Sequence, residues 1–287
     1  MSDRRPDPLA APALLDAAMG TALLARGLPP GELPEAWILT RPEEVAAVHA
    51  AHTAAGARLL LTCTFNAAEP RLATRGLDPK LEALCGWAER LARVAARSAL
   101  VAGCLGPSGL PGSAHPAEWR EAFARPFRAL AAAGADLLWA ETHYRLGEAR
   151  AALAAGLATG LPVAVTMAFA EREGALVAPD GAPAAECLRA LAQDGAAAVG
   201  VNCVAPSPAL AALVAEVASG LPVPLAVKPN AGPPGRLLPP EDFARAVAPA
   251  LRAGARLAGG CCGTTADHLR ALGRILDGPF AGSRAAR

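Results

Sequence analysis

The sequence predicts an α/β protein that forms a single (β/α)₈ barrel of the TIM type. Short runs rich in Val and Leu recur along the whole chain, and longer alanine-rich stretches separate them. Alternation of strand and helix implies a parallel sheet covered by helices. Eight such units in roughly 270 residues fit a closed barrel better than a doubly wound sheet.

The expected elements follow from this alternation and from their boundary signals. We expect strands near residues 14–16, 58–64, 100–105, 136–141, 162–168, 198–203, 225–229 and 255–260. We expect helices near residues 43–55, 80–98, 117–132, 146–157, 183–192, 208–218, 241–251 and 265–276. Proline and acidic residues mark several helix starts, as in Pro42-Glu43-Glu44.

Composition and charge indicate a folded, soluble protein. The chain is 53% hydrophobic and 18% charged, and its net charge of +1 comes without a basic run that would favour nucleic-acid binding. Polar residues and prolines interrupt the longest uncharged stretch, and the N-terminus lacks the apolar core of a signal peptide. We expect a cytoplasmic protein without a membrane partner. A single domain is expected over 12–277, between flexible segments at 1–11 and 278–287; homo-oligomerisation is left open.

The cysteines indicate metal binding or catalysis. Their number is seven, and an odd number in such a chain argues against a disulfide framework. Four of them fit the common role of a small buried hydrophobe: Cys63, Cys85, Cys104 and Cys187.

Polar and sulfur-containing residues follow the expected strands at the ends where barrel active sites gather. Glycines flank Cys261 and Cys262, so the backbone can leave strand geometry and turn both sulfurs toward one point. Cys203 ends another strand at the same rim. Three thiolates with one open coordination position are typical of a reactive zinc site. Simple packing and a redox-active disulfide between Cys261 and Cys262 are the alternatives.

Five segments, in this order, resemble those of the homocysteine S-methyltransferase family. They are Asp16-x-x-Met19-Gly20-Thr21, Thr62-x-Thr64-Phe65, Val201-Asn202-Cys203, Lys228-Pro229-Asn230 and Gly259-Gly260-Cys261-Cys262-Gly263-Thr264. Two positions depart from the family pattern: Ala17 replaces a glycine, and Cys63 replaces an asparagine.

This resemblance implies specific roles for the residues at the rim. Cys203, Cys261 and Cys262 would bind Zn²⁺, and Asp16 and Glu141 would contact the amino group of homocysteine, with Thr64 nearby. The two acids could instead form an acid/base pair or a salt-bridge network.

The resemblance also implies a reaction, in which a methyl group passes from a cationic donor to the thiol of L-homocysteine and gives methionine. The chain lacks cobalamin modules and the C-terminal extension of betaine-dependent relatives, so S-methylmethionine or S-adenosylmethionine is the favoured donor. Trp37 either offers a π face to such a cation or packs under a loop. Betaine, a partner corrinoid protein, a different thiol, a dithiol redox protein and a barrel with a purely structural metal are the alternatives.

Overall fold

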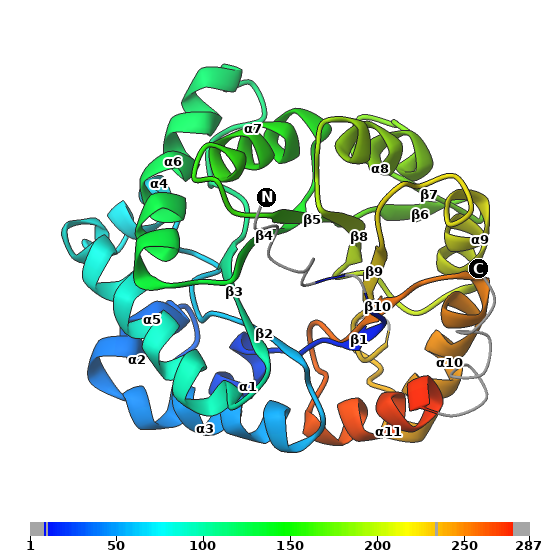
Figure 1. Cartoon of the computed structure of the whole chain (residues 1–287), viewed down its shortest axis with the longest axis horizontal. Coiled ribbons are helices and arrows are strands. Elements are labelled where there is room, and N and C mark those ends of the chain that lie inside the picture. Colours follow the sequence, from blue (N-terminus) through cyan, green and yellow to red (C-terminus); the bar gives the residue numbers. More distant parts are fainter. Residues whose placement is uncertain (1–8, 10, 233–234, 278–287) are drawn as a thin grey trace, which may run out of the picture.

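Parallel strands form a closed ring in the computed structural model, which describes residues 9, 11–232 and 235–277 (Figure 1). The strands of the ring are β1 (Ala13–Leu14), β2 (Leu59–Leu61), β3 (Leu100–Leu105), β4 (Leu137–His143), β5 (Val163–Met167), β8 (Ala198–Asn202), β9 (Leu225–Lys228) and β10 (Leu257–Ala258). They pair in the order β1-β10-β9-β8-β5-β4-β3-β2. A parallel bridge between Leu15, which follows β1, and Leu59 of β2 joins the two ends of this order. The ring is therefore closed, which confirms the predicted barrel.

Helices surround this ring, and each predicted helix is present with its ends shifted by a few residues (Figure 1). They are α3 (Pro42–Ala54), α5 (Leu81–Ala96), α6 (Pro116–Ala133), α7 (Leu146–Leu157), α8 (Ala184–Gln193), α9 (Pro208–Val217), α10 (Pro240–Ala253) and α11 (Ala266–Asp277). Proline at a helix start, as at Pro42, Pro116 and Pro240, fits because the first turn needs no N–H donor there.

Two layers of apolar side chains hold the barrel. Alternate strand residues such as Leu59, Leu61 and Trp139 point inward and pack as one cluster. Their neighbours along the strands, such as Leu60 and Leu138, pack outward against the helices in a second, larger cluster. The interior is therefore filled by side chains, and a ligand could reach the strands from an end of the barrel.

The structure adds short elements that the sequence did not predict. Helices α1 (Gly20–Leu24), α2 (Pro34–Thr40) and α4 (Glu69–Ala73) and the 3₁₀ helix η1 (Asp78–Lys80) lie in the loops that follow β1 and β2. A hairpin of β6 (Ala170–Arg172) and β7 (Ala175–Val177) follows β5. Its turn residues, Glu173 and Gly174, both have positive φ, which is the twist that two-residue hairpins favour.

Two expectations lie at or beyond the limits of the described chain. The segments predicted to be flexible, 1–11 and 278–287, lie outside the described residues except for Leu9 and Ala11, and the domain bounds remain a prediction. None of the described helices is both long and apolar enough to cross a bilayer.

Candidate functional site

A cavity of about 400 Å³ opens at the carboxyl ends of the barrel strands. Its wall comes from the loops after β1, β2, β4, β8 and β10, together with the ends of β3 and β9. Asp16, Glu141 and the three predicted metal-binding cysteines all line it. The rim that the sequence analysis selected is thus a real concave site, of the size that binds small molecules.

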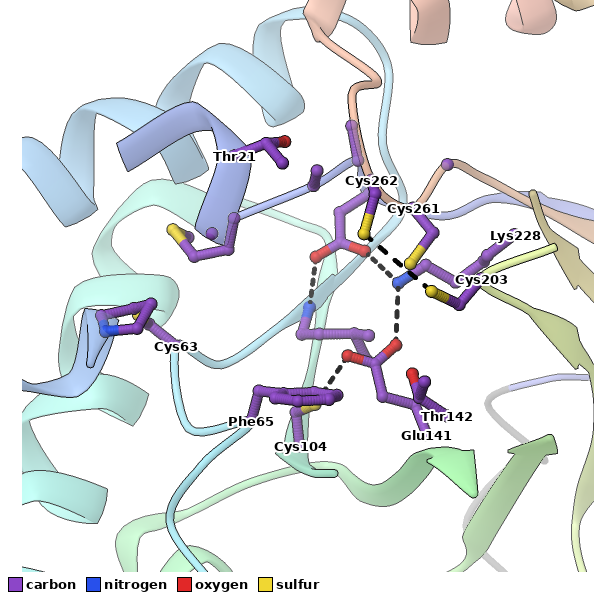
Figure 2. Close-up of a pocket in the computed structure, with 18 of the residues that line it drawn as sticks. Thr21, Cys63, Phe65, Cys104, Glu141, Thr142, Cys203, Lys228, Cys261 and Cys262 are labelled. Atoms are coloured by element: carbon purple, nitrogen blue, oxygen red, sulfur yellow. Dashed lines mark hydrogen bonds and ion pairs between the residues drawn. The ribbon is translucent and has the colours of Figure 1, made fainter. Parts of the chain in front are cut away.

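The three cysteines converge in this cavity. The sulfur atoms of Cys203, Cys261 and Cys262 all lie within 4.8 Å of one another, and the Sγ atoms of Cys203 and Cys262 are 3.9 Å apart. Figure 2 shows the three side chains pointing toward a common point. Among the described residues, this is the group of His, Cys, Asp and Glu side chains placed to hold a metal ion.

The backbone around the pair Cys261–Cys262 explains how neighbouring sulfurs reach one point. Strand β10 ends at Ala258, so neither cysteine has strand geometry. A Cβ on Gly259 would lie 2.5 Å from the carbonyl oxygen of Asp16, which makes glycine necessary where this turn passes β1. The loop after β9 fixes the pair: the N–H of Cys261 donates to the carbonyl of Pro229, and the N–H of Cys262 donates to Oδ1 of Asn230.

Asn202 supports the cluster from the end of β8, a role that the sequence analysis did not assign. Its Nδ2 lies 3.9 Å from Sγ of Cys261 and 2.6 Å from Oγ1 of Thr142, and its Oδ1 accepts the N–H of Thr142. Cys203, the next residue, has a φ of 58°, a left-handed conformation that is uncommon for a residue other than glycine. A buried amide and a strained backbone thus orient the sulfurs.

The thiols also polarise one another. Hydrogen bonds from Cys203 and Cys261 lower the pKa of Cys262 to about 3, because they stabilise its thiolate. The same hydrogen bonding raises the pKa of Cys203. Close thiols that favour negative charge on one sulfur suit a bound cation.

The donor set fits a zinc ion by type and by spacing. Zinc–thiolate bonds are about 2.3 Å long, so two sulfurs on a tetrahedral ion lie about 3.8 Å apart. The Sγ atoms of Cys203 and Cys262, which are 3.9 Å apart, match that spacing. All three sulfurs lie within 4.8 Å of one another, so small rotations of the side chains would bring the group to it. Three protein ligands leave a fourth position for a substrate.

Two carboxylates and one lysine lie beside the thiols. The Nζ atom of Lys228 is 2.8 Å from Oδ1 of Asp16 and 3.7 Å from Oε2 of Glu141 (Figure 2). The side chains of Asp16 and Lys228 are almost fully buried, and that of Glu141 is mostly buried. Burial raises the pKa of Glu141 to about 7, although the charge of Lys228 opposes this shift. Burial alone would lower the pKa of Lys228, but the two carboxylates raise it overall, so the lysine stays charged.

Cys104 contacts this group from the end of β3. Its Sγ donates a hydrogen bond of 3.3 Å to Oε1 of Glu141, so this buried thiol does more than fill space. Thr64, the third predicted substrate contact, is fully buried, and its hydroxyl donates to the carbonyl of Cys104. Thr64 lies behind Cys104 and not in the cavity lining, and its predicted role remains a prediction, as do those of Asp16 and Glu141.

Apolar side chains also contribute to the wall of the cavity. Met19, Leu24 and Phe65 line it, together with Glu35, whose carboxylate accepts two hydrogen bonds from Asn66 and so joins the first two loops.

Two residues that the sequence analysis left open are buried. Trp37 packs in the hydrophobic core, with the guanidinium of Arg41 over its ring, and does not line the cavity. Packing is therefore the role that the structure gives it. Cys63 lines the cavity but is buried apart from the three clustered cysteines. Cys85, Cys104 and Cys187 are buried as predicted.

Comparison with known proteins adds a family to this geometry. The model of the family described as homocysteine S-methyltransferase matches residues 13–276. The chain belongs to the homocysteine S-methyltransferase family. Its members are methyltransferases, which confirms the resemblance stated above and identifies the chain as a methyltransferase.

Individual relatives share most of the chain. The homocysteine S-methyltransferase of Escherichia coli is 35% identical, and the match covers 90% of this chain and 93% of the relative. Homocysteine S-methyltransferase 1 of Zea mays is 29% identical, with 93% and 94% covered. Betaine–homocysteine S-methyltransferase 1 of Mus musculus is 31% identical, with 85% of this chain and 66% of the relative covered.

A solved structure supports both the fold and the metal. The metallated form of the homocysteine methyltransferase MmuM from Escherichia coli matches with a TM-score of 0.76 and 32% identity, over 92% of this chain and 98% of that one. Its oxidized form matches with a TM-score of 0.77, over 93% and 98%. A relative of this similarity thus binds a metal on the same barrel.

Proposed function

We propose that this methyltransferase transfers a methyl group from a small sulfonium donor to the thiol of L-homocysteine at a zinc site formed by Cys203, Cys261 and Cys262. The observation that carries the proposal is the convergence of these three sulfurs within 4.8 Å in a cavity that also holds buried charged groups. Zinc bound there would stabilise the thiolate of the substrate, which is the nucleophilic form.

The acceptor is the amino-acid thiol because of the charges beside the cysteines. Asp16 and Glu141 would hold the ammonium of homocysteine, since each carboxylate keeps acceptor capacity beyond the contacts it already makes. The backbone N–H of Leu61 fixes Asp16, and the thiol of Cys104 fixes Glu141. Fixed carboxylates position the substrate without the cost of ordering them during binding. Methyl transfer between sulfurs needs alignment more than proton transfer.

The donor is S-methylmethionine or S-adenosylmethionine, and the surroundings support a cation. The cysteines and carboxylates make the site anionic overall, which favours a positively charged donor that becomes neutral as its methyl group leaves. The apolar wall of Met19, Leu24 and Phe65 suits the body of such a donor. Betaine and methylated corrinoids are the donors against which this proposal is tested.

A donor panel tests the proposal directly. The zinc-loaded protein is incubated with homocysteine and one donor at a time: S-methylmethionine, S-adenosylmethionine, betaine or methylcobalamin. We expect methionine from one or both sulfonium donors, with kcat/KM at least about tenfold above the other donors. A preference for betaine or methylcobalamin would overturn the donor assignment. Failure of every donor with homocysteine, but success with another thiol, would overturn the acceptor.

A further inference from the structure

Lys228 occupies an unusual position in the cavity. Among the described residues that line it, Lys228 is the only basic side chain. Its side chain is 4% exposed, and its ammonium lies between the two carboxylates that would hold the substrate's ammonium. Burying a lysine costs free energy even when carboxylates pair its charge, so we expect Lys228 to have a function at this place in the cavity.

The choice of lysine over arginine is a second observation. The chain has 27 Lys and Arg residues, and only two of them, Lys80 and Lys228, are lysines. An arginine guanidinium presents a planar fork, whereas an ammonium presents three donors around one point. Within the described chain, the hydrogen bond to Asp16 and the ion pair with Glu141 engage at most two of these donors. At least one N–H remains for a further acceptor.

The substrate of the proposed function brings such an acceptor. Homocysteine carries an α-carboxylate next to its ammonium, and a carboxylate that enters a buried site needs a cationic or hydrogen-bonding partner. We propose that Lys228 binds this α-carboxylate and so selects amino-acid thiols over simple thiols. The proposal rests on the proposed function, because it takes an amino-acid thiol as the acceptor.

The charges of the site and of the substrate then alternate. Asp16 and Glu141 face the substrate's ammonium, and Lys228, which lies between them, faces its carboxylate. The alternative is that Lys228 only screens the two carboxylates from each other. Screening would affect the binding of any ammonium-bearing thiol, whereas carboxylate recognition affects only thiols that carry a carboxylate.

Substrate analogues distinguish these roles. Calorimetry on the zinc-loaded protein compares homocysteine with 3-aminopropane-1-thiol, which lacks the carboxylate, and with 4-sulfanylbutanoate, which lacks the ammonium. In Lys228→Gln we expect Kd for homocysteine and for 4-sulfanylbutanoate to rise about 10- to 100-fold, because a charge-assisted hydrogen bond is lost. Binding of 3-aminopropane-1-thiol should be unchanged or tighter. Lys80→Gln, at an exposed position, is the matched control and should bind all three like the wild type.

Two outcomes would overturn the assignment. One is an equal change, in either direction, in the Kd of homocysteine and of 3-aminopropane-1-thiol in Lys228→Gln, which is the result expected for screening. The other is unchanged binding of homocysteine by that variant. If the wild type itself binds no homocysteine, the proposed function fails first, and the role of Lys228 fails with it.

A measurement on the wild-type protein tests the proposal even if Lys228→Gln does not fold. Because the chain contains only two lysines, protein labelled with ¹³C-lysine gives two ε-methylene signals, and Lys80 serves as the internal reference. We expect saturating 4-sulfanylbutanoate to shift the signal of Lys228 and to leave that of Lys80 in place. An unshifted Lys228 signal at saturation would overturn the proposal.

Discussion

Single residues decide the chemistry of this site more than any element does. Cys203 adopts a left-handed backbone conformation, and Asn202 beside it contacts Cys261, so contacts within the chain itself orient the sulfurs. Preformed ligands bind a metal more tightly because less conformational freedom is lost on binding. The sequence predicted the ligands, but the contacts that support them became visible only in three dimensions.

The Cys261→Ala variant should lose both zinc and activity. Two remaining thiolates do not complete the site, so we expect less than one tenth of the wild-type zinc content and at least about a 1,000-fold loss of methyl transfer. Metal analysis and a methionine assay measure both. Cys187→Ala, in the buried face of α8, is the control and should keep its zinc. Full activity in a zinc-free Cys261→Ala protein would rule out the metal mechanism.

Neutralising the carboxylates should weaken homocysteine binding and leave the metal in place. We expect Asp16→Asn and Glu141→Gln each to raise KM for homocysteine about 10- to 100-fold, because each loses a charge-assisted hydrogen bond to the ammonium. Zinc content should match the wild type. Glu216→Gln, an exposed acid on α9, is the matched control. If both site variants bind homocysteine normally, the anchoring role is wrong.

At the scale of elements, the loops after the strands carry the function and the strands fix where each loop begins. Continuous apolar runs predicted the strands, because these strands are buried on both faces, and longer alanine-rich stretches with a buried face predicted the long helices. Helices α1, α2 and α4 were missed because five to seven residues contain too few turns to show a periodicity. Their packing on the barrel, not their sequence, stabilises them.

A methyl group on Gly259 should disturb the turn that presents Cys261 and Cys262. The added Cβ would lie 2.5 Å from the Asp16 carbonyl oxygen, so the backbone must move. We expect Gly259→Ala to lower zinc affinity at least about tenfold and stability by about 1–3 kcal/mol, measured with a competing chelator and by urea unfolding. Gly86→Ala in α5 meets no atom within 4 Å and should leave zinc affinity unchanged. Wild-type zinc affinity in Gly259→Ala would refute this explanation.

Helix α3 contains a histidine that should make the fold sensitive to acid. His49 is fully buried, and neither ring nitrogen has a hydrogen-bond partner within the described part of the chain. Burial, reinforced by His52 and opposed by Asp16, lowers its pKa to about 4. An unfolded histidine titrates near 6.5, so the unfolded state takes up the proton first as the pH falls, and stability is lost between about pH 6.5 and 4.

The variant His49→Leu isolates this effect from other titrating groups. Relative to His49→Leu, the wild type should lose roughly 2 kcal/mol of unfolding free energy between pH 7 and pH 5. Urea unfolding at a series of pH values measures the difference, which should stay nearly constant between pH 7 and 8. If the difference in unfolding free energy between wild type and His49→Leu stays constant down to pH 5, protonation of His49 does not destabilise the fold.

For the whole molecule, the barrel divides the cysteines into two groups. Four thiols are buried, although Cys63 and Cys104 among them also line the cavity, and the other three meet in that cavity within 4.8 Å of one another. Position in the barrel, and not position in the sequence, thus decides which cysteines could share a metal ion.

Thiol titration should reveal the two groups in order. With zinc bound, we expect almost no thiol to react with an aromatic disulfide reagent; a chelator should release three, and a denaturant should expose all seven. A disulfide between Cys261 and Cys262 predicts a different series, in which a reductant and not a chelator exposes two thiols. That second series would favour the redox alternative over zinc.

The sequence alone predicted the barrel, and it predicted that three cysteines and two carboxylates meet at its rim, because apolar runs and strand-end positions are both local properties of a chain. The tertiary structure decided the rest. It placed Lys228 between Asp16 and Glu141, joined Cys104 to Glu141 and turned Trp37 into the core. Such contacts connect residues up to 212 positions apart, and only closure of the ring of strands sets those distances.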